Sequence, residues 1–451
     1  MAILPRSVRV SDALPQTQLA KPPAWLWSLF VLMVALAPGS SKVAGAIWFL
    51  MVGAAGIAFF CSPKAQVLRG EDAERLGLLR LWLYFCAAAF AFKAVGMFYW
   101  GDPWWTRHFD FRIVCAAAAM PILMARFQPS SAQRNLLVTA LCIASGVALA
   151  VAYRFAYHGI DTPSQRINWA GGLVMLACIT LPLIKLSFMS KLNQWAMAVA
   201  TVVLVVAVLL TGSRGSYLAL PWVVLGSVWL FGRNLRAIFE VKAAGLRMAM
   251  LLLVVLIALP MALPKVFEVP VARVMLGVTE MHAMVTGSPR NSKAIDTSVG
   301  TRVYMWRKSE EKMLDSPWIG YGRDQRMAFI QEWGAEVNAE MVTDQTHMHS
   351  EYINGMIDHG IFGLLSTLSY MVGVAVLAWK LRKRFPVAAF SVGGIAFTHC
   401  VMSFTDTNSQ TNNYSVMITV SLLIIFWLAL PYPEDQAATA GHPLPDTPRT
   451  A

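Results

Sequence analysis

Long uninterrupted apolar runs are the feature that most restricts what this chain can fold into. The runs are about 17–25 residues long, the length that an α-helix needs to cross the hydrocarbon core of a bilayer. A soluble protein could not hide so many such runs, because its surface helices carry a polar stripe. Of 451 residues, 57% are hydrophobic and only 14% are charged, whereas soluble domains carry about 25% charged residues. The sequence therefore predicts an all-α, polytopic membrane protein.

About twelve membrane spans are expected from the pattern of apolar runs. They are centred on residues 24–38, 43–61, 79–99, 112–126, 136–155, 168–185, 195–211, 216–231, 246–263, 361–379, 386–404 and 414–432. We accordingly expect four regions: an N-terminal transmembrane bundle (1–263), a large outer loop (264–350), a C-terminal group of transmembrane helices (351–433) and a tail (434–451). The tail is rich in Pro, Ala and Thr and is expected to be disordered.

The distribution of Lys and Arg predicts the orientation in the membrane. If the N-terminus is cytoplasmic, the inner segments hold 20 of the 37 basic residues, the 264–350 loop holds ten, and the other outer segments hold seven. Basic residues are enriched on the cytoplasmic side of membrane proteins, so both termini are expected inside and the loop outside. This topology, with contact to anionic membrane lipids, accounts for most of the net charge of +12. No basic-aromatic module of the kind that binds nucleic acid is visible.

The 264–350 loop is too long to be a simple connector. It shows helix-like patterning at 303–314 and again at 325–341. Between these segments, residues 317–322 form a turn rich in helix breakers and aromatic side chains, including Tyr321. Long ordered loops in compact proteins usually carry function. The alternative is an outer lid that only packs against the bundle.

Several arginines lie where spans are expected to meet the outer membrane face. Arg214 occupies a very short Gly- and Ser-rich turn, Thr211–Tyr217, between two apolar runs; Arg154, Arg166 and Arg302 also flank outer segments. A charge at this depth is costly unless it faces water, a partner or an anionic ligand. Guanidinium groups bind phosphate in a bidentate manner, so converging arginines favour a phosphate-bearing ligand. The alternative is that these side chains only reach to lipid headgroups.

Two histidines, His347 and His349, lie where the loop enters the next span. With Asp344 and Glu351 they could be read as metal ligands, but zinc needs a third and a fourth ligand held in place. A second interpretation is a general base, since imidazole changes its protonation state near neutral pH. A third is that both histidines merely tolerate the membrane interface.

The residues around His349 resemble a known family signature. His349-Ser350 is followed, after nine residues, by Gly360-Ile361-Phe362-Gly363. This pattern resembles the signature of the O-antigen ligase and polymerase superfamily. With the expected spans, the large outer loop and the Ser213-Arg214-Gly215 turn, the chain resembles bacterial O-antigen ligases from about residue 24 to about residue 432.

The resemblance implies a metal-independent, inverting glycosyltransferase of the bacterial inner membrane, with a periplasmic active site and no cofactor. The implied donor is a polysaccharide on undecaprenyl diphosphate, and the implied acceptor is a sugar hydroxyl of the lipid A core. His349 would act as general base. The resemblance implies that Arg214 and Arg302 bind the diphosphate, with Arg154 or Arg166 in addition. Secondary candidates for the site are His347 and Tyr321.

Other functions stay open at this point. The superfamily also contains O-antigen polymerases and protein O-oligosaccharyltransferases, which share the donor chemistry and differ in the acceptor. The ligase is favoured because no additional domain is seen after the last span. A transporter of a lipid-linked glycan belongs to a different class and would favour charges at mid-span and paired broken helices. Here the ionisable residues gather instead at the outer edge.

Overall fold

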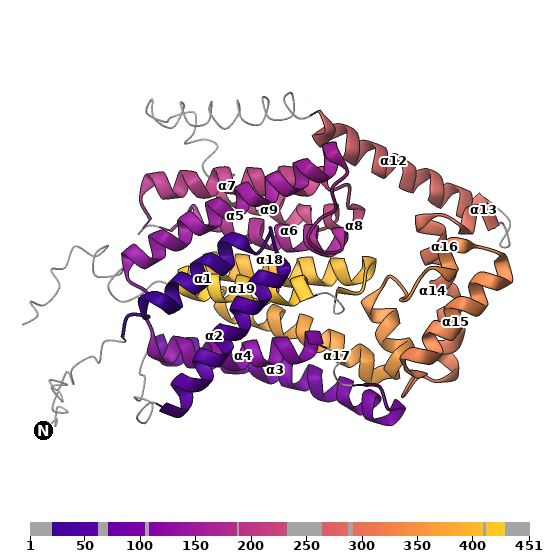
Figure 1. The fold of residues 1–451 in the computed structure, drawn as a ribbon, viewed down its shortest axis with the longest axis horizontal. Coiled ribbons are helices and arrows are strands. Elements are labelled where there is room, and N and C mark those ends of the chain that lie inside the picture. The colour runs from indigo at the N-terminus through magenta and orange to yellow at the C-terminus, as the bar shows by residue number, and fades with distance from the viewer. Residues whose placement is uncertain are drawn as a thin grey trace, which may run out of the picture.

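The structure is a computed structural model that describes residues 20–61, 71–103, 108–186, 189–231, 264–286, 292–408 and 412–428. These residues form helices joined by turns (Figure 1). The helices of the bundle are α1 (Ala24–Leu36), α2 (Ser41–Cys61), α3 (Glu71–Trp100), α4 (His108–Arg126), α5 (Ser131–His158), α6 (Arg166–Leu183), α7 (Lys191–Leu210), α8 (Arg214–Tyr217), α9 (Leu220–Phe231), α17 (Glu351–Leu381), α18 (Pro386–Thr405) and α19 (Asn412–Leu428). The helices of the loop are α12 (Lys265–Thr286), α13 (Ser292–Ile295), α14 (Ser298–Asp315), α15 (Gly322–Val337) and α16 (Glu340–Thr343).

The expected membrane spans coincide with described helices in all but one case. Within the described ranges, seven helices are long and apolar enough to cross a membrane, and α1 and Tyr414–Leu428 are shorter apolar helices. The ninth expected span, 246–263, and the tail, 434–451, lie outside the described residues. The all-α, polytopic membrane class is confirmed.

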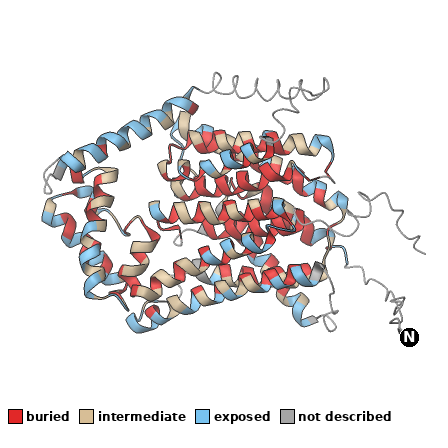
Figure 2. Ribbon diagram, turned by 180° about the vertical axis from the view of Figure 1, so that it is seen from behind, coloured by how far each residue is buried: buried red, intermediate tan, exposed pale blue. Residues whose placement is uncertain are grey.

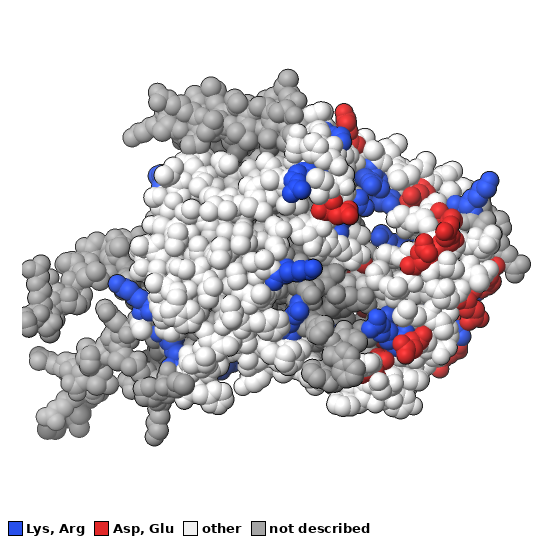
Figure 3. Space-filling view, in the orientation of Figure 1, with Lys and Arg blue, Asp and Glu red and all other residues white. Residues whose placement is uncertain are grey.

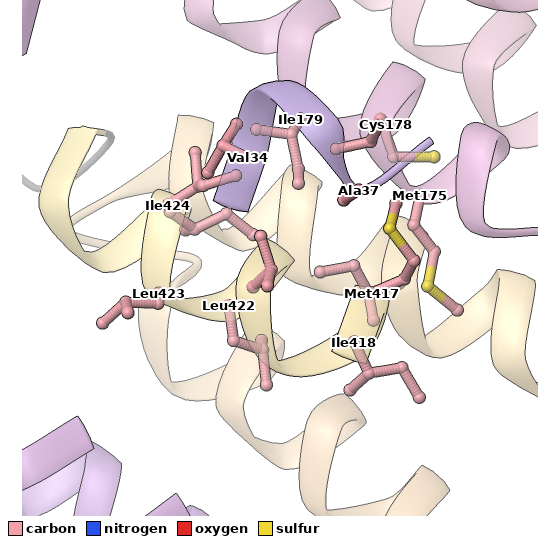
Figure 4. Close-up of a cluster of buried hydrophobic side chains, with 14 of the residues drawn as sticks. Val34, Ala37, Met175, Cys178, Ile179, Met417, Ile418, Leu422, Leu423 and Ile424 are labelled. Carbon is pink, nitrogen blue, oxygen red and sulfur yellow. The ribbon is translucent and has the colours of Figure 1, made fainter. Parts of the chain in front are cut away.

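The bundle is organised around α6. Its apolar window is 89% buried, whereas that of α3 is only 28% buried, so α6 lies at the centre and α3 at the lipid-facing periphery. Side chains of α1, α6 and α19 interdigitate in this core, with Val34, Ile179 and Met417 among them (Figure 4). Buried residues face inward in every layer, and many exposed residues on the outer helices are apolar (Figure 2). Apolar side chains on the outside are expected where lipid replaces water.

The two ends of the bundle differ in character. Helices α12–α16 all lie at one end, which we call the loop end (Figure 1). At the opposite end the short turns meet: Arg384 forms an ion pair with Glu74, and the Asn193 side chain donates to Asn135 at 2.8 Å. Charged side chains gather at the loop end and where it meets the bundle, and most of the remaining visible surface of the bundle is free of them (Figure 3).

Helix α17 begins ten residues earlier than the span expected at 361–379. Its first segment carries polar residues that are nevertheless buried, among them Glu351 and Asp358. The helix kinks at His359 and Gly360, where Gly360 has φ +59°. A Cβ atom at Gly360 would lie 2.3 Å from the carbonyl carbon of Trp318, so only glycine allows the approach at this kink.

The expected turn at 317–322 docks on this kink. The Ile361 N–H donates to the Pro317 carbonyl, and the Tyr321 N–H donates to the Ile357 carbonyl, both at 2.8 Å. The two segments on either side of the turn, expected to be helical, form α14 and α15. They enclose a small hydrophobic core of their own, which includes Tyr304, Phe329 and Met348. The loop is therefore fixed to the bundle next to its histidine segment.

Candidate active site

The histidine segment is held through Met348, which is fully buried in the loop core. The Trp306 indole N–H donates to the Met348 carbonyl at 2.7 Å, and the Met348 N–H donates to the Asn354 side chain at 3.3 Å. Met348 is buried in this core, whereas the side chains of His347 and His349 on either side of it lie against Asp406.

The two imidazoles meet one carboxylate, that of Asp406. His347 Nε2 and His349 Nδ1 each lie 3.6 Å from Asp406 Oδ1. The two rings are 4.4 Å apart at their centroids and nearly perpendicular. The sequence interpretation did not include Asp406, which follows α18 two helices later in the chain.

Asp406 is completely buried at the C-terminus of α18, where the Thr407 N–H donates to its Oδ1 at 2.8 Å. Burial acts to raise the pKa of its carboxyl, but the neighbouring His349, His347 and Thr407 N–H act the other way and hold that pKa below its usual value. Burial also lowers the pKa of His347 to about 4, helped by the nearby His349. At neutral pH the site therefore combines a carboxylate with a neutral His347.

His349 adopts a backbone conformation that is unusual for its residue type, with φ +49°. Such conformations cost of order 1–3 kcal/mol and cluster at functional sites. Its Nε2 lies 2.6 Å from Gln345 Oε1. The Gln345 amide N–H donates in turn to the Met341 carbonyl at 2.8 Å, which orients the Gln345 oxygen towards His349.

Arg214 lies on the short helix α8, at the loop end of the bundle. Helix α7 ends at Leu210, and Gly212, two residues later, has φ +67°. A Cβ atom on Gly215 would lie 2.3 Å from the Thr405 hydroxyl, so α8 packs directly on the residue before Asp406. The Arg214 guanidinium forms an ion pair with Glu280 of α12 at 3.1 Å. The eighth expected span, 216–231, is thus interrupted, because α8 turns before α9 begins.

A group of arginines surrounds this point. Arg302 is half-buried, and the charges of Asp406, Arg214 and Glu280 all act on it. The charges of Arg273 and Arg214 act on Arg166 in the same way. We call Arg166, Arg214, Arg273 and Arg302 the arginine group. Arg302 links the arginine group to the histidine segment, because it interacts electrostatically with both Asp406 and Arg214.

A hollow of about 560 Å³ opens beside Arg214, between α8 and α12. Apart from Arg214 and His282, its lining is mainly apolar, with Val274, Val278 and Met281 contributed by α12. Gly277 leaves room for the guanidinium, since a Cβ atom there would lie 2.7 Å from Arg214 Nη1. The site thus combines an apolar groove with a cationic end.

The remaining candidates lie elsewhere. Arg154 is exposed and lines a separate hollow of about 320 Å³ with Lys42 and Asp161. Tyr321 packs in the loop core with its ring 5.1 Å from that of Phe329.

The two carboxylates considered as metal ligands also stand apart from the histidines. Asp344 is exposed. Glu351 accepts a hydrogen bond from Ser403 at 2.9 Å. Among the described residues, the group with the geometry to hold a metal ion is His347, His349 and Asp406.

Arg273 and Asp406 were both missed by sequence reasoning. Arg273 lies in the apolar-rich segment that forms α12, and Asp406 is a single acid after a span. The only sequence signal for Asp406 was its position at the outer end of an expected helix, which it shares with many interfacial residues.

Comparison with known proteins adds an independent finding. Residues 199–368 match a protein-family model described as O-Antigen ligase. No curated protein matches the chain. The matched segment includes Arg214, Arg302, His347 and His349, whereas Asp406, Arg154 and Arg166 lie outside it. The resemblance noted in the sequence is thereby supported: residues 199–368 of this chain are similar to the O-antigen ligase family.

Proposed function

We propose that this protein is an O-antigen ligase, an inverting and metal-independent glycosyltransferase. It moves a polysaccharide from undecaprenyl diphosphate to a sugar hydroxyl of the lipid A core during lipopolysaccharide biosynthesis. The observation that carries the proposal is the meeting of His349 and Asp406 with the arginine group at one end of a membrane bundle. A base and an anion-binding group at that point suit a reaction between two lipid-anchored substrates.

His349 is the general base in this proposal. Asp406 faces Nδ1 of the ring and stabilises the imidazolium that forms. The acceptor hydroxyl takes the place of Gln345 at Nε2. With Gln345 displaced, the ring proton of the neutral imidazole lies on Nδ1, facing Asp406, and Nε2 is free to accept. As the acceptor oxygen attacks the anomeric carbon, its proton passes to Nε2, and the bond from that carbon to the diphosphate oxygen breaks. Attack from the side opposite the leaving group inverts the anomeric centre.

The arginine group binds the donor diphosphate and stabilises the charge that remains when it leaves. A diphosphate is already a good leaving group, so fixed positive charges can do this without a metal ion. Glu280 holds the Arg214 guanidinium in the absence of donor, and the diphosphate replaces that carboxylate. The apolar hollow between α8 and α12 accommodates part of the polyprenyl chain, which keeps the lipid tail beside its head group.

The loop end faces the periplasm of a Gram-negative inner membrane, and both termini are cytoplasmic. This proposal rests on the excess of Lys and Arg in the turns of the opposite end. Residues 264–350 form the catalytic loop between the two transmembrane parts, 1–263 and 351–433.

The test is transfer in vitro with purified protein, lipid-linked donor and lipid A core acceptor. We expect a lipopolysaccharide product from the wild-type protein and little or none from His349→Ala. Absence of any product from a folded wild-type protein would contradict the proposal.

The lipid fraction of a deletion strain separates the ligase from its relatives. Loss of a ligase leaves full-length polysaccharide on the carrier lipid and bare core. Loss of a polymerase leaves single repeat units, and loss of a transporter leaves the glycan on the cytoplasmic side. A protein O-oligosaccharyltransferase would leave lipopolysaccharide intact.

A further inference from the structure

The cluster of His347, His349 and Asp406 has the spacing of a metal site. Its ligand atoms all lie within 4.8 Å of one another. The two nitrogen-to-oxygen distances of 3.6 Å are too long for hydrogen bonds. Zinc binds nitrogen and oxygen at about 2.0–2.2 Å, which places neighbouring ligand atoms of a tetrahedron about 3.4 Å apart. The two observed nitrogen-to-oxygen distances are close to this separation between the ligand atoms of a tetrahedral zinc site.

Three buried polar atoms of the cluster also lack a hydrogen-bond partner among the described residues. His349 Nδ1, His347 Nδ1 and Asp406 Oδ2 are buried, and none of them has a hydrogen-bond partner among the described residues. A buried polar atom without a partner is unfavourable, because it has lost its hydrogen bonds to water. An ion bound between His347 Nε2, His349 Nδ1 and Asp406 would engage the carboxylate and one of the two unpartnered nitrogens.

The ligands are held in place before any ion arrives. Met348 fixes the segment between the histidines, and the Thr407 N–H fixes the carboxylate. Three protein ligands leave the fourth position of a tetrahedron open to water. Two imidazoles and a carboxylate suit zinc and the neighbouring first-row divalent ions better than magnesium or calcium, which prefer oxygen ligands.

We propose that His347, His349 and Asp406 bind a zinc-type divalent cation, and that the bound ion inhibits glycan transfer. The inhibition rests on the proposed function, whereas the binding does not. A neutral imidazole that gives Nδ1 to a metal carries its proton on Nε2. His349 then has no lone pair left to accept the proton of the acceptor hydroxyl.

The surrounding charge predicts an exchangeable ion rather than a permanent one. The positive charge of Arg302 acts on Asp406, and that of Arg326 acts on His347. Both oppose the arrival of a second cation. The ion is therefore expected to bind reversibly and to be removed by a chelator without unfolding of the protein.

Binding is tested on the full-length protein in detergent, purified through a tag without histidines and treated with chelator. Co²⁺ is the spectroscopic probe, since tetrahedral Co²⁺ absorbs strongly in the visible range, and Zn²⁺ is then added to displace it. We expect one saturable site. His349→Ala and Asp406→Asn each change a direct ligand and should weaken it by at least about 10–100-fold, the loss that follows removal of a group that only supports a ligand. His158→Ala, at an exposed histidine of α5, is the control.

Unchanged Co²⁺ and Zn²⁺ binding in both cluster variants would refute the site, and so would the absence of saturable binding by the wild-type protein. The binding result of a variant is interpreted only if the protein elutes as a monodisperse species and has the wild-type melting temperature. His347→Ala provides the third, independent removal of a ligand.

Inhibition is tested by adding Zn²⁺ to the transfer assay. The Zn²⁺ concentration that halves the rate should match the binding constant. In His347→Ala this half-inhibitory Zn²⁺ concentration should rise by the same factor by which Zn²⁺ binding weakens. Each protein is compared with its own transfer rate in the absence of zinc. Activation by Zn²⁺ would refute the inhibitory role. A protein that binds Zn²⁺ at this cluster but shows no transfer under any condition would contradict the proposed function and leave the metal site supported.

Discussion

Asp406 is the residue whose removal tests the proposed site most directly, because it was identified by the fold and not by a sequence motif. Asp406→Asn keeps the shape of the side chain and removes its charge. In the transition state, His349 becomes an imidazolium 3.6 Å from Asp406 Oδ1. Two unit charges at this distance attract each other by about 4–5 kcal/mol at an effective dielectric constant near 20.

This energy corresponds to a rate factor of about 10³. The Asn side chain recovers part of it through its own dipole, so we expect transfer to fall by about 10²–10³. The assay is single-turnover transfer at saturating donor, so that the rate reports the chemical step. Donor binding should stay near the wild-type value, since the arginine group is unchanged.

Two variants control this experiment. Asp344→Asn makes the same substitution at an exposed carboxylate of the loop and should transfer at nearly the wild-type rate. Asp406→Glu keeps the charge and should retain more activity than Asp406→Asn. Transfer by a folded Asp406→Asn within about threefold of wild type, well below the Coulomb magnitude, would refute a role for this carboxylate in stabilising His349.

Four further outcomes are expected. His349→Ala should insert and bind donor but lose about 10²–10⁴ in rate, whereas His347→Ala should be milder; the opposite ranking would mean that His347 is the base. Arg214→Lys keeps the charge but loses the bidentate fork, so donor binding and transfer should both fall at normal membrane levels, and full activity in the Lys and Ala variants would leave Arg214 with only a lipid-contact role. A chelator should not lower transfer in vitro, and a loss that zinc or magnesium restores would make the ion part of the catalytic mechanism. Single cysteines placed in 264–350 should react with an impermeant reagent from outside and those in 380–385 only from inside; the reverse pattern would overturn the proposed orientation.

Sequence alone predicted the features that depend on short stretches of chain. An apolar run of sufficient length must become a helix in the bilayer, because its backbone has no other way to satisfy its hydrogen bonds there. The same reasoning identified the turn that holds Arg214 and the segment that holds His349, since breakers and charges at a membrane edge are visible in a window of a few residues. The helical patterning of α14 and α15 was visible in the same way.

Tertiary structure decided which of these residues meet. Asp406 joins His349 only because α18 packs beside α17 and ends at the level where the loop enters the bundle. Arg302 approaches Arg214 because the loop folds back onto α8, whereas Arg154, equally prominent in the sequence, lines a different hollow. Close approach of α8 to α18 depends on the missing side chain of Gly215 against Thr405. Periodicity is a property of one helix, but contacts between helices depend on how several surfaces fit together, and no single stretch of sequence contains that information.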